Sequence, residues 1–354
     1  MTDASWEVLS NQALAAAGVV YFLALLCHLV EWAALLGKDK QRAAAPELVA
    51  AGQAGPDTVA ADSTEGGTTE ATGSGPDLDH RRAFFGRLGL LLTIVATCCH
   101  GVSLVGRGMA ADPNRVPWGN MYEFTVAGTF VLSVAYLALY RKFKLAWLAP
   151  LVLIFNLACL MIAVIWLYDP VAPLTEALNS YWLVIHVVSA VIATGAFSLA
   201  GLLSIVYLLK LRKPGATTGL LAHVPSTDVL ERTSYRIHAF AFPVWTFAVL
   251  ITGPIWAHEA WSRYWNWDPK EVWAFITWVV YAGYLHARAT GGWRGRNAAW
   301  ISLIGLASLW YSFIGVNFFN DASQHSYAGS LPAPTTAVVQ TVDQPLAPAP
   351  TANL

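Results

Sequence analysis

Charged residues are scarce in this 354-residue sequence, and so is cysteine. Only 12% of the residues are Asp, Glu, Lys or Arg, whereas 56% are hydrophobic, which is too apolar for an ordinary soluble protein. The four cysteines all fall within long apolar runs, and no CxxC or CxxCH motif occurs. These absences argue against an external disulfide, a thioredoxin-type redox motif and a covalent haem attachment site within the chain.

The sequence also lacks an internal repeat of fixed period, but it contains eight continuous apolar runs. A bilayer core about 30 Å thick requires roughly 20 apolar residues per helical span, and each run is about that long or longer. Continuous rather than alternating hydrophobicity favours helices over a membrane β-barrel. We therefore expect an all-α, polytopic integral membrane bundle of about eight transmembrane helices. The expected spans are residues 12–36, 84–105, 121–140, 145–168, 181–209, 237–256, 271–289 and 298–318.

Lysine and arginine are distributed unequally between alternate connections. If the N-terminus is external, only Arg107, Arg115, Arg263 and Lys270 lie outside, and 17 of the 21 basic residues lie inside. Since cytoplasmic loops carry the excess of positive charge, both termini are expected to be external. No positive charge precedes the first span and its apolar region is long, so we expect a true helix rather than a cleaved signal peptide.

Composition then divides the chain into four parts. Two stretches are rich in small and polar residues and nearly free of bulky apolar ones, which is typical of disorder or low complexity. The predicted parts are an external N-terminus with the first helix (1–36), a disordered cytoplasmic linker (37–83), a membrane domain (84–328) and a low-complexity external tail (329–354).

One external stretch, HEAWSRYWNWDPKEVW at residues 258–273, combines aromatic and charged side chains. Within it, DPKE has the pattern of a helix start, with Asp268 as N-cap, Pro269 at the first helical position and Glu271 completing a capping box. A cap explains the position of Asp268 fully, and a catalytic acid or a metal ligand is the alternative. The loop WGNMYEF repeats the pattern, with Asn120 as cap and Glu123 three residues later.

The tryptophans of this stretch allow two interpretations. Aromatic residues commonly form a belt at membrane surfaces. A belt is spread over many helix ends, however, whereas these rings are concentrated in one connection. A flat conjugated ligand would fit such a surface, with Arg263 and Lys270 meeting its acidic substituents. Composition alone leaves both interpretations open.

Histidines supply candidate iron ligands at two depths. His186 is expected about 9 Å below the outer end of its span, and His325 follows the last span on the same side. His286 lies about 22 Å along the span 271–289, toward the cytoplasmic side. Two imidazoles from different segments can hold haem iron axially, and an ionisable residue within a span is a functional candidate by default.

Other histidines have different interpretations. His258, inside the aromatic stretch, competes for the role of outer ligand. We expect His28 and His100 to be core residues or a helix-contact pair, and His238 to reach water at the inner surface.

In this order, the motifs resemble the System II cytochrome c biogenesis proteins, the CcsA/ResC haem-handling family. The segment WAHEAWSRYWNWDPKEVWAFITW followed by YLHAR is similar to the WWD signature of that family. SYWLVIHVVSA and HSYAG resemble the segments that carry its two external histidines, and WGNMYEF resembles its loop before a helix. The similarity runs from about residue 84 to 328. Two features differ: Ser262 stands where the family has glycine, and the loop before residue 121 lacks the longer FPLSN form.

The resemblance implies specific site residues. His186 and His325 would be the external axial haem ligands, and His286 a membrane-embedded ligand. The haem-presenting WWD surface would comprise Trp261, Trp265, Trp267 and Asp268.

The resemblance also implies a function. The chain would bind haem b, deliver it to the outer face and present it for thioether attachment to the CxxCH segment of apocytochrome c, as a positioning component of a cytochrome c synthase. The expected partners are a CcsB/ResB-type membrane protein, apocytochrome c, thiol-reducing proteins and membrane lipid, but no nucleic acid. The expected location is the plasma (inner) membrane of a bacterium, with the active face external.

Three other functions remain open. A membrane haem b electron-transfer protein would need pairs of histidines at matching depths, whereas the inner site has one good candidate. A transporter of another amphipathic ring compound would use the tryptophans as an outer gate. A structural membrane subunit would need neither ligand.

Overall fold

The computed structural model describes residues 2–52, 74–172, 180–216, 219–290, 293–319 and 323. Helices dominate these ranges and no strand occurs in them, so the predicted all-α class is confirmed. His325 and the predicted tail 329–354 lie outside the described residues.

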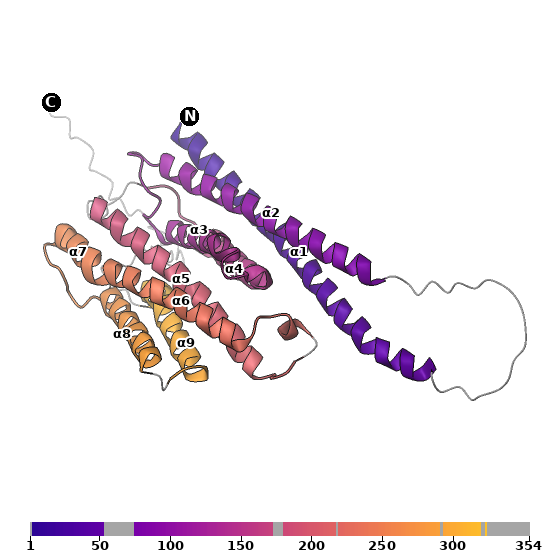
Figure 1. Ribbon diagram of the computed structural model, residues 1–354. Coiled ribbons are helices and arrows are strands. Elements are labelled where there is room, and N and C mark those ends of the chain that lie inside the picture. Colours follow the sequence, from indigo (N-terminus) through magenta and orange to yellow (C-terminus); the bar gives the residue numbers. More distant parts are fainter. Residues whose placement is uncertain are drawn as a thin grey trace, which may run out of the picture.

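The described helices make eight passages between two ends of the bundle (Figure 1). Two passages contain a π-helical turn, η4 between α6 and α7 and η5 between α9 and α10. The elements are α1 (Asp3–Gly52), α2 (Ser74–Met109), α3 (Met121–Tyr140), η1 (Leu145–Leu148), α4 (Ala149–Trp166), α5 (Tyr181–Leu211), η3 (Leu220–Ala222), α6 (Thr227–Thr246), η4 (Phe247–Thr252), α7 (Gly253–Trp261), α8 (Pro269–Ala289), α9 (Arg296–Trp310), η5 (Tyr311–Gly315) and α10 (Val316–Phe319).

Seven passages within the described ranges are long and apolar enough to cross a membrane. The span predicted at 271–289 is present as α8 and packs beside α9, but it is not among the seven. His286 and Arg288 near its end, together with its tyrosines and tryptophans, make it less apolar than the other passages. The chain is therefore a polytopic membrane protein.

The first two helices are longer than the predicted spans 12–36 and 84–105. α1 continues to Gly52 and α2 begins at Ser74, so both ends of the predicted linker 37–83 are helical. The middle of that linker, residues 53–73, lies outside the described residues.

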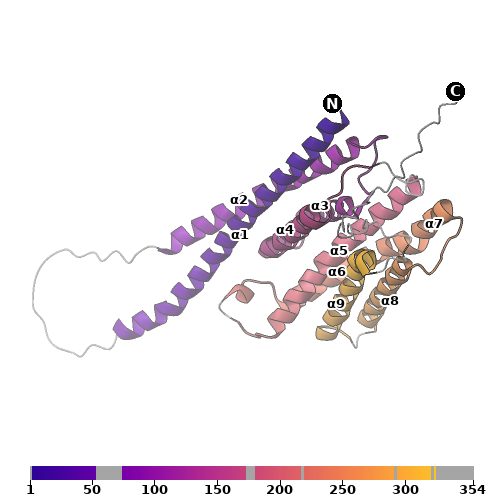
Figure 2. The ribbon, with the colours of Figure 1, turned by 180° about the vertical axis from the view of Figure 1, so that it is seen from behind.

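α5 is the central helix of the bundle. Its middle turns are buried on all sides, with Phe197, Leu199 and Ala200 each 0% exposed, as expected for a helix that is apolar all round. It packs against α3, α6 and α9. The α1–α2 hairpin lies to one side and meets the other helices through α3 and α4, as both views of the ribbon show (Figure 2).

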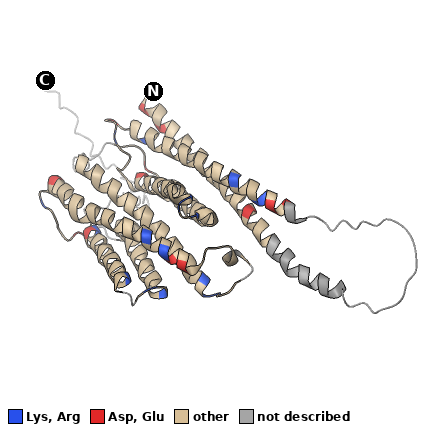
Figure 3. Ribbon diagram, in the orientation of Figure 1, with Lys and Arg blue, Asp and Glu red and all other residues tan. Residues whose placement is uncertain are grey.

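The two ends of the bundle differ in composition. We call the end that carries residues 256–268 the aromatic end. We call the opposite end, with the α5–α6 and α8–α9 connections, the basic end, because lysines and arginines gather there (Figure 3).

A buried carboxylate fixes the loop before α3 at the aromatic end. Glu123 is 1% exposed and accepts hydrogen bonds from Arg107 Nε at 2.9 Å, Arg115 Nη1 at 2.7 Å and the Gly119 N–H at 2.6 Å. The predicted N-cap is confirmed, since Asn120 Oδ1 accepts the Glu123 N–H at 2.9 Å. Glu123 itself reaches Gly119 rather than the cap residue, because two arginines draw its carboxylate toward them.

The predicted exposure of His238 is wrong. α6 begins well before this residue, so the ring lies inside the helix bundle and is 0% exposed. Its Nδ1 donates to the Ser234 carbonyl oxygen at 2.8 Å, and Ser302 Oγ donates to its Nε2 at 3.0 Å. His28 and His100 are buried, at 1% and 0% exposure, as expected of core residues.

Candidate functional site

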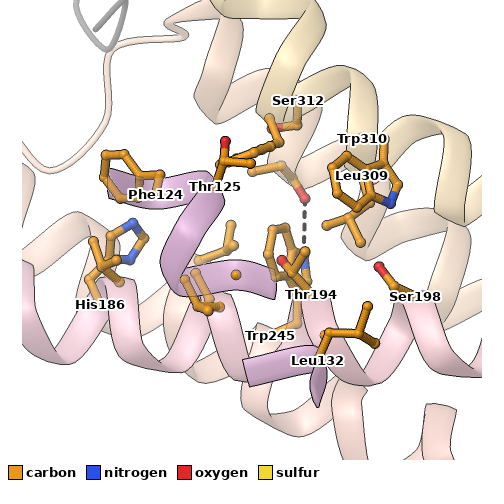
Figure 4. Close-up of a pocket in the computed structure, with 18 of the residues that line it drawn as sticks. Phe124, Thr125, Leu132, His186, Thr194, Ser198, Trp245, Leu309, Trp310 and Ser312 are labelled. Carbon is orange, nitrogen blue, oxygen red and sulfur yellow. Dashed lines mark hydrogen bonds between the residues drawn. The ribbon is translucent and has the colours of Figure 1, made fainter. Parts of the chain in front are cut away.

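A largely apolar cavity of about 170 Å³ lies between α3 and α5 on one side and the passages α6–η4–α7, α8 and α9–η5 on the other, with one residue of α4 in its wall. His186 and Phe124 lie at one end of it, and Ser198 and Leu132 lie at the other (Figure 4). Twelve helical residues separate His186 from Ser198, a rise of about 18 Å. The cavity therefore runs from the aromatic end toward the middle of the bundle.

His186 is held by a backbone carbonyl of a neighbouring passage. Its Nδ1 lies 2.9 Å from the Ala248 carbonyl oxygen. Since a carbonyl oxygen only accepts, Nδ1 carries the proton, and the lone pair of the neutral ring is on Nε2. A histidine that ligates a metal commonly donates its other N–H to a carbonyl in this way, which fixes its tautomer and ring orientation.

The π-helical turn η4 explains the position of that carbonyl. Pro254, the second residue of α7, has no N–H to donate, and a proline ring collides with the carbonyl four residues earlier in a regular α-helix. The chain responds with a wider turn, in which the Gly253 N–H bonds to Ala248 five residues back. Thr252 Oγ1 also donates to the Ala248 carbonyl, at 3.1 Å. Such π-turns are frequent at functional sites.

Trp256 forms an aromatic face beside His186. The two rings are stacked, with centroids 5.9 Å apart and an interplanar angle of 12°. Trp256 is 2% exposed and lines the cavity, and Trp261 packs edge-on against it at 4.9 Å. The imidazole is therefore fixed by a hydrogen bond on its edge and by an indole on its face.

Asp268 is the N-cap of α8, as predicted. Its Oδ1 accepts the Lys270 N–H at 2.9 Å, and Glu271 Oε2 accepts the Asp268 N–H at 3.1 Å, which completes the capping box. Ser323 Oγ donates to the same Oδ1 at 2.7 Å. Asp268 is 4% exposed. Its hydrogen bond with Ser323 joins the start of α8 to the segment that follows α10.

Lys270 and Arg263, predicted to act together, are separated in the structure. Lys270 is half-buried, lines the cavity and donates from Nζ to Asn317 Oδ1 at 3.2 Å. Arg263 is exposed and does not contribute to the cavity wall. Of these two cations, Lys270 at the start of α8 is the one that faces the cavity.

The family of the chain follows from sequence comparison. The Cytochrome C assembly protein family matches residues 118–322, more than half of the chain. The chain belongs to this family. It is 34% identical over 260 residues to the cytochrome c biogenesis protein CcsA of Guillardia theta, covering 68% of this chain and 85% of that protein. The CcsA proteins of Trieres chinensis and Chlamydomonas reinhardtii are 34% identical over 277 residues and 35% identical over 219 residues, covering 68% and 60% of this chain and 86% and 60% of those proteins.

Membership of the cytochrome c assembly family makes the chain a membrane protein of cytochrome c biogenesis. The matched region includes the cavity walls and the aromatic stretch, and α1 and α2 precede it. The residues that hold His186 therefore all belong to the region shared with the family.

The other tryptophans of the aromatic stretch lie outside the cavity wall. Trp267 is 72% exposed, and Trp265 packs edge-on against it with centroids 5.9 Å apart. Trp261 is not part of the cavity wall and packs against the cluster of Leu183, Val187 and Trp256. His258, the competing candidate for the outer ligand, is exposed, is stacked on Tyr264 at 4.3 Å and does not line the cavity.

Ser262, at the position where the sequence motif led us to expect glycine, has a backbone conformation that favours glycine. It ends α7 in the left-handed conformation, with φ 57° and ψ 27°. Trp267 also has φ 57°. Residues with a Cβ rarely adopt this conformation, so the loop holds an aromatic ring outward through a strained backbone.

His286 lies far from His186. It is exposed on the last turn of α8, at the basic end, and 16 helical residues from Lys270 correspond to about 24 Å. The structure thus separates the two predicted depths, with His186 at one end and His286 near the other.

Sequence reasoning missed the residues that position His186. Ala248, Gly253 and Pro254 lie inside or beside the predicted span 237–256, where they looked like ordinary apolar helix. The Gly-Pro pair was the available signal, because proline in a span interrupts the hydrogen-bond ladder.

Proposed function

We propose that this chain is the membrane subunit of a System II cytochrome c synthase, which binds haem b, brings it to the outer membrane face and presents it to the CxxCH segment of apocytochrome c. The observation that carries this proposal is the arrangement of His186. An imidazole with its lone pair on Nε2 lines an apolar cavity together with Trp256 and Lys270. These are a ligand for iron, a face for a conjugated ring and a cation for an acidic substituent.

The residues of this chain act by positioning. Each thioether forms when a cysteine S–H adds across a vinyl C=C of haem, so sulfur bonds to one carbon, hydrogen to the other, and no electrons are gained or lost. Such an addition gains most from correct orientation of the two reactants. His186 would hold the iron and Trp256 would face the ring, while the exposed Trp267 and the partly buried Trp265 would form the surface that an apocytochrome meets.

The second external ligand in this proposal is His325. It lies outside the described residues, two positions after Ser323 in the sequence. The hydrogen bond from Ser323 to Asp268 supports the assignment, because it attaches the chain just before His325 to the aromatic stretch. The incoming histidine of CxxCH would replace one of the two external ligands.

His286 is the proposed membrane-embedded ligand. Its side chain is exposed on α8, so a ligand from another protein can approach it. We propose that a CcsB/ResB-type partner supplies the opposite ligand, and that separate proteins keep the apocytochrome thiols reduced. The orientation follows the positive-inside rule, with the basic end cytoplasmic in a bacterial plasma membrane and the aromatic end external.

Replacement of single histidines tests the proposal. The chain is purified with its membrane partner, haem content is measured from the optical spectrum, and covalent cytochrome c is measured by haem staining of the cells. His186→Ala should lower both quantities, whereas His258→Ala, at the same end but outside the cavity, should leave both unchanged. Unchanged haem content and cytochrome yield in His186→Ala, His325→Ala and His286→Ala alike would refute the assignment. Retained haem with reversible redox cycling and normal cytochrome yield would favour an electron-transfer protein instead.

A further inference from the structure

A second hollow lies at the basic end, on the opposite side of the membrane domain from His186. It is a groove of about 540 Å³ between the last turns of α5 and the first turns of α9. Its apolar wall is open to the surroundings, with Ile205, Leu209 and Trp300 exposed by 38%, 44% and 46%. A half-exposed tryptophan beside leucines is typical of the level where lipid chains meet head groups.

Two arginines stand at the polar edge of the groove. Arg212 follows the last turn of α5 and Arg296 is the first residue of α9, and both are exposed. Both arginines therefore contribute positive charge to the same site.

The two segments that line the groove carry no carboxylate. Residues 205–216 and 293–303 contain five basic residues and no Asp or Glu. The Glu231 carboxylate on α6 is engaged by Arg288 and by the Gly295 N–H. In the part of the chain that the structure describes, no ion pair involves Arg212 or Arg296.

We propose that this groove is a binding site for an anionic phospholipid. The two guanidinium groups would hold the phosphate by charge-assisted hydrogen bonds, which arginine forms with paired geometry. An acyl chain would lie along Leu208, Leu209 and Leu303. Basic pockets between transmembrane helices on the cytoplasmic side are a known form of acidic-lipid recognition. The site is independent of haem binding at the aromatic end.

Native mass spectrometry of the purified full-length chain tests the site. Phosphatidylglycerol is compared with phosphatidylcholine for the wild type and for Arg212→Gln/Arg296→Gln. The control is Lys213→Gln/Arg294→Gln, which removes the same charge from neighbouring exposed positions outside the groove. The groove variant should bind phosphatidylglycerol about 25-fold more weakly, at about fivefold for each arginine, and the control should retain most of the affinity.

Three results would overturn the proposal. Equal loss in the control variant would indicate attraction to the general charge of this end. Equal binding of phosphatidylcholine and phosphatidylglycerol by the wild type would exclude recognition of the acidic head group. Haem is another acidic amphiphile, so haem binding that depends on Arg212 and Arg296 while phosphatidylglycerol binding does not would assign the groove to haem. Phosphatidylglycerol preference lost only in the groove variant would support the proposal.

Discussion

Gly253 leaves room for the His186 imidazole, and a methyl group at this position tests whether that fit matters. A Cβ on Gly253 would lie 3.2 Å from Cε1 and 3.3 Å from Nδ1 of His186, and 3.1 Å from the Ala248 carbonyl oxygen. Carbon contacts are most favourable at about 3.5–4.0 Å, so the ring and the carbonyl must each move by a few tenths of an ångström. The Nδ1···O distance of 2.9 Å would then lengthen.

The expected loss can be worked from that hydrogen bond. An intramolecular hydrogen bond contributes about 1 kcal/mol, and loss of a group that orients a metal ligand costs about 10–100-fold in affinity. We expect Gly253→Ala to weaken haem binding by about tenfold. Crowding in the core also costs about 1–3 kcal/mol of folding free energy, so stability must be measured separately.

The assay combines haem titration of the purified apoprotein with ¹⁵N NMR of its histidines, which reports the tautomer of His186 without haem. The matched control is Gly18→Ala on α1, where an added Cβ meets nothing within 4 Å. Unchanged haem affinity together with an unchanged Nδ1–H signal in folded Gly253→Ala would refute the positioning argument. If Gly253→Ala changes the Nδ1–H signal but the wild-type protein itself does not bind haem, the proposed function is contradicted. The positioning of His186 by Ala248 and Gly253 would still be supported.

Substitutions at three further positions give contrasting outcomes. Asp268→Asn should keep cytochrome formation, because asparagine caps a helix as well as aspartate does. Asp268→Ala should lose about 1 kcal/mol of folding free energy in a thermal unfolding assay. If the Asn variant folds but does not support cytochrome formation, a chemical role for the carboxylate is favoured. Ser262→Gly should raise thermal stability by about 0.5–1 kcal/mol, since glycine adopts the left-handed conformation without strain, and a lower melting temperature would contradict this. Glu123→Gln should cost about 3–5 kcal/mol and lower the amount of protein in the membrane, because two arginines lose a buried partner. The exposed Glu259→Gln is the control, and equal abundance of both variants would contradict the role assigned to Glu123.

Local features of the fold were predictable from sequence. Apolar runs located the passages, because a bilayer leaves only helices able to satisfy their own backbone. The caps at Asn120 and Asp268 were also predictable, since a cap is a contact between residues two or three apart. α8 was the least certain of the predicted spans. Its length predicted a membrane span, but with its polar end it is not among the seven passages that are apolar enough to cross a membrane.

Non-local contacts were not predictable in the same way. The carbonyl that holds His186 belongs to a residue 62 positions later, and its direction depends on a π-turn that hydrophobicity does not reveal. His238 shows the same limit, because a neighbouring helix supplies Ser302 and makes burial of the ring possible. Spacing along one helix gives the depth of a residue but not the partner that it faces.

The proposed function requires two kinds of order at the aromatic end, one for the proposed ligand and one for the surface that meets the apocytochrome. The ligand side is rigid, because His186 is fixed by the Ala248 carbonyl and the Trp256 ring inside the helix bundle. The outer side is accessible, because Trp267 is 72% exposed on a left-handed residue directly before the capping box of α8. Sites on helices hold geometry better than sites on loops, while loops reach a partner more easily. The Asp268 cap joins the two, since it anchors the loop to α8 one residue after the exposed ring.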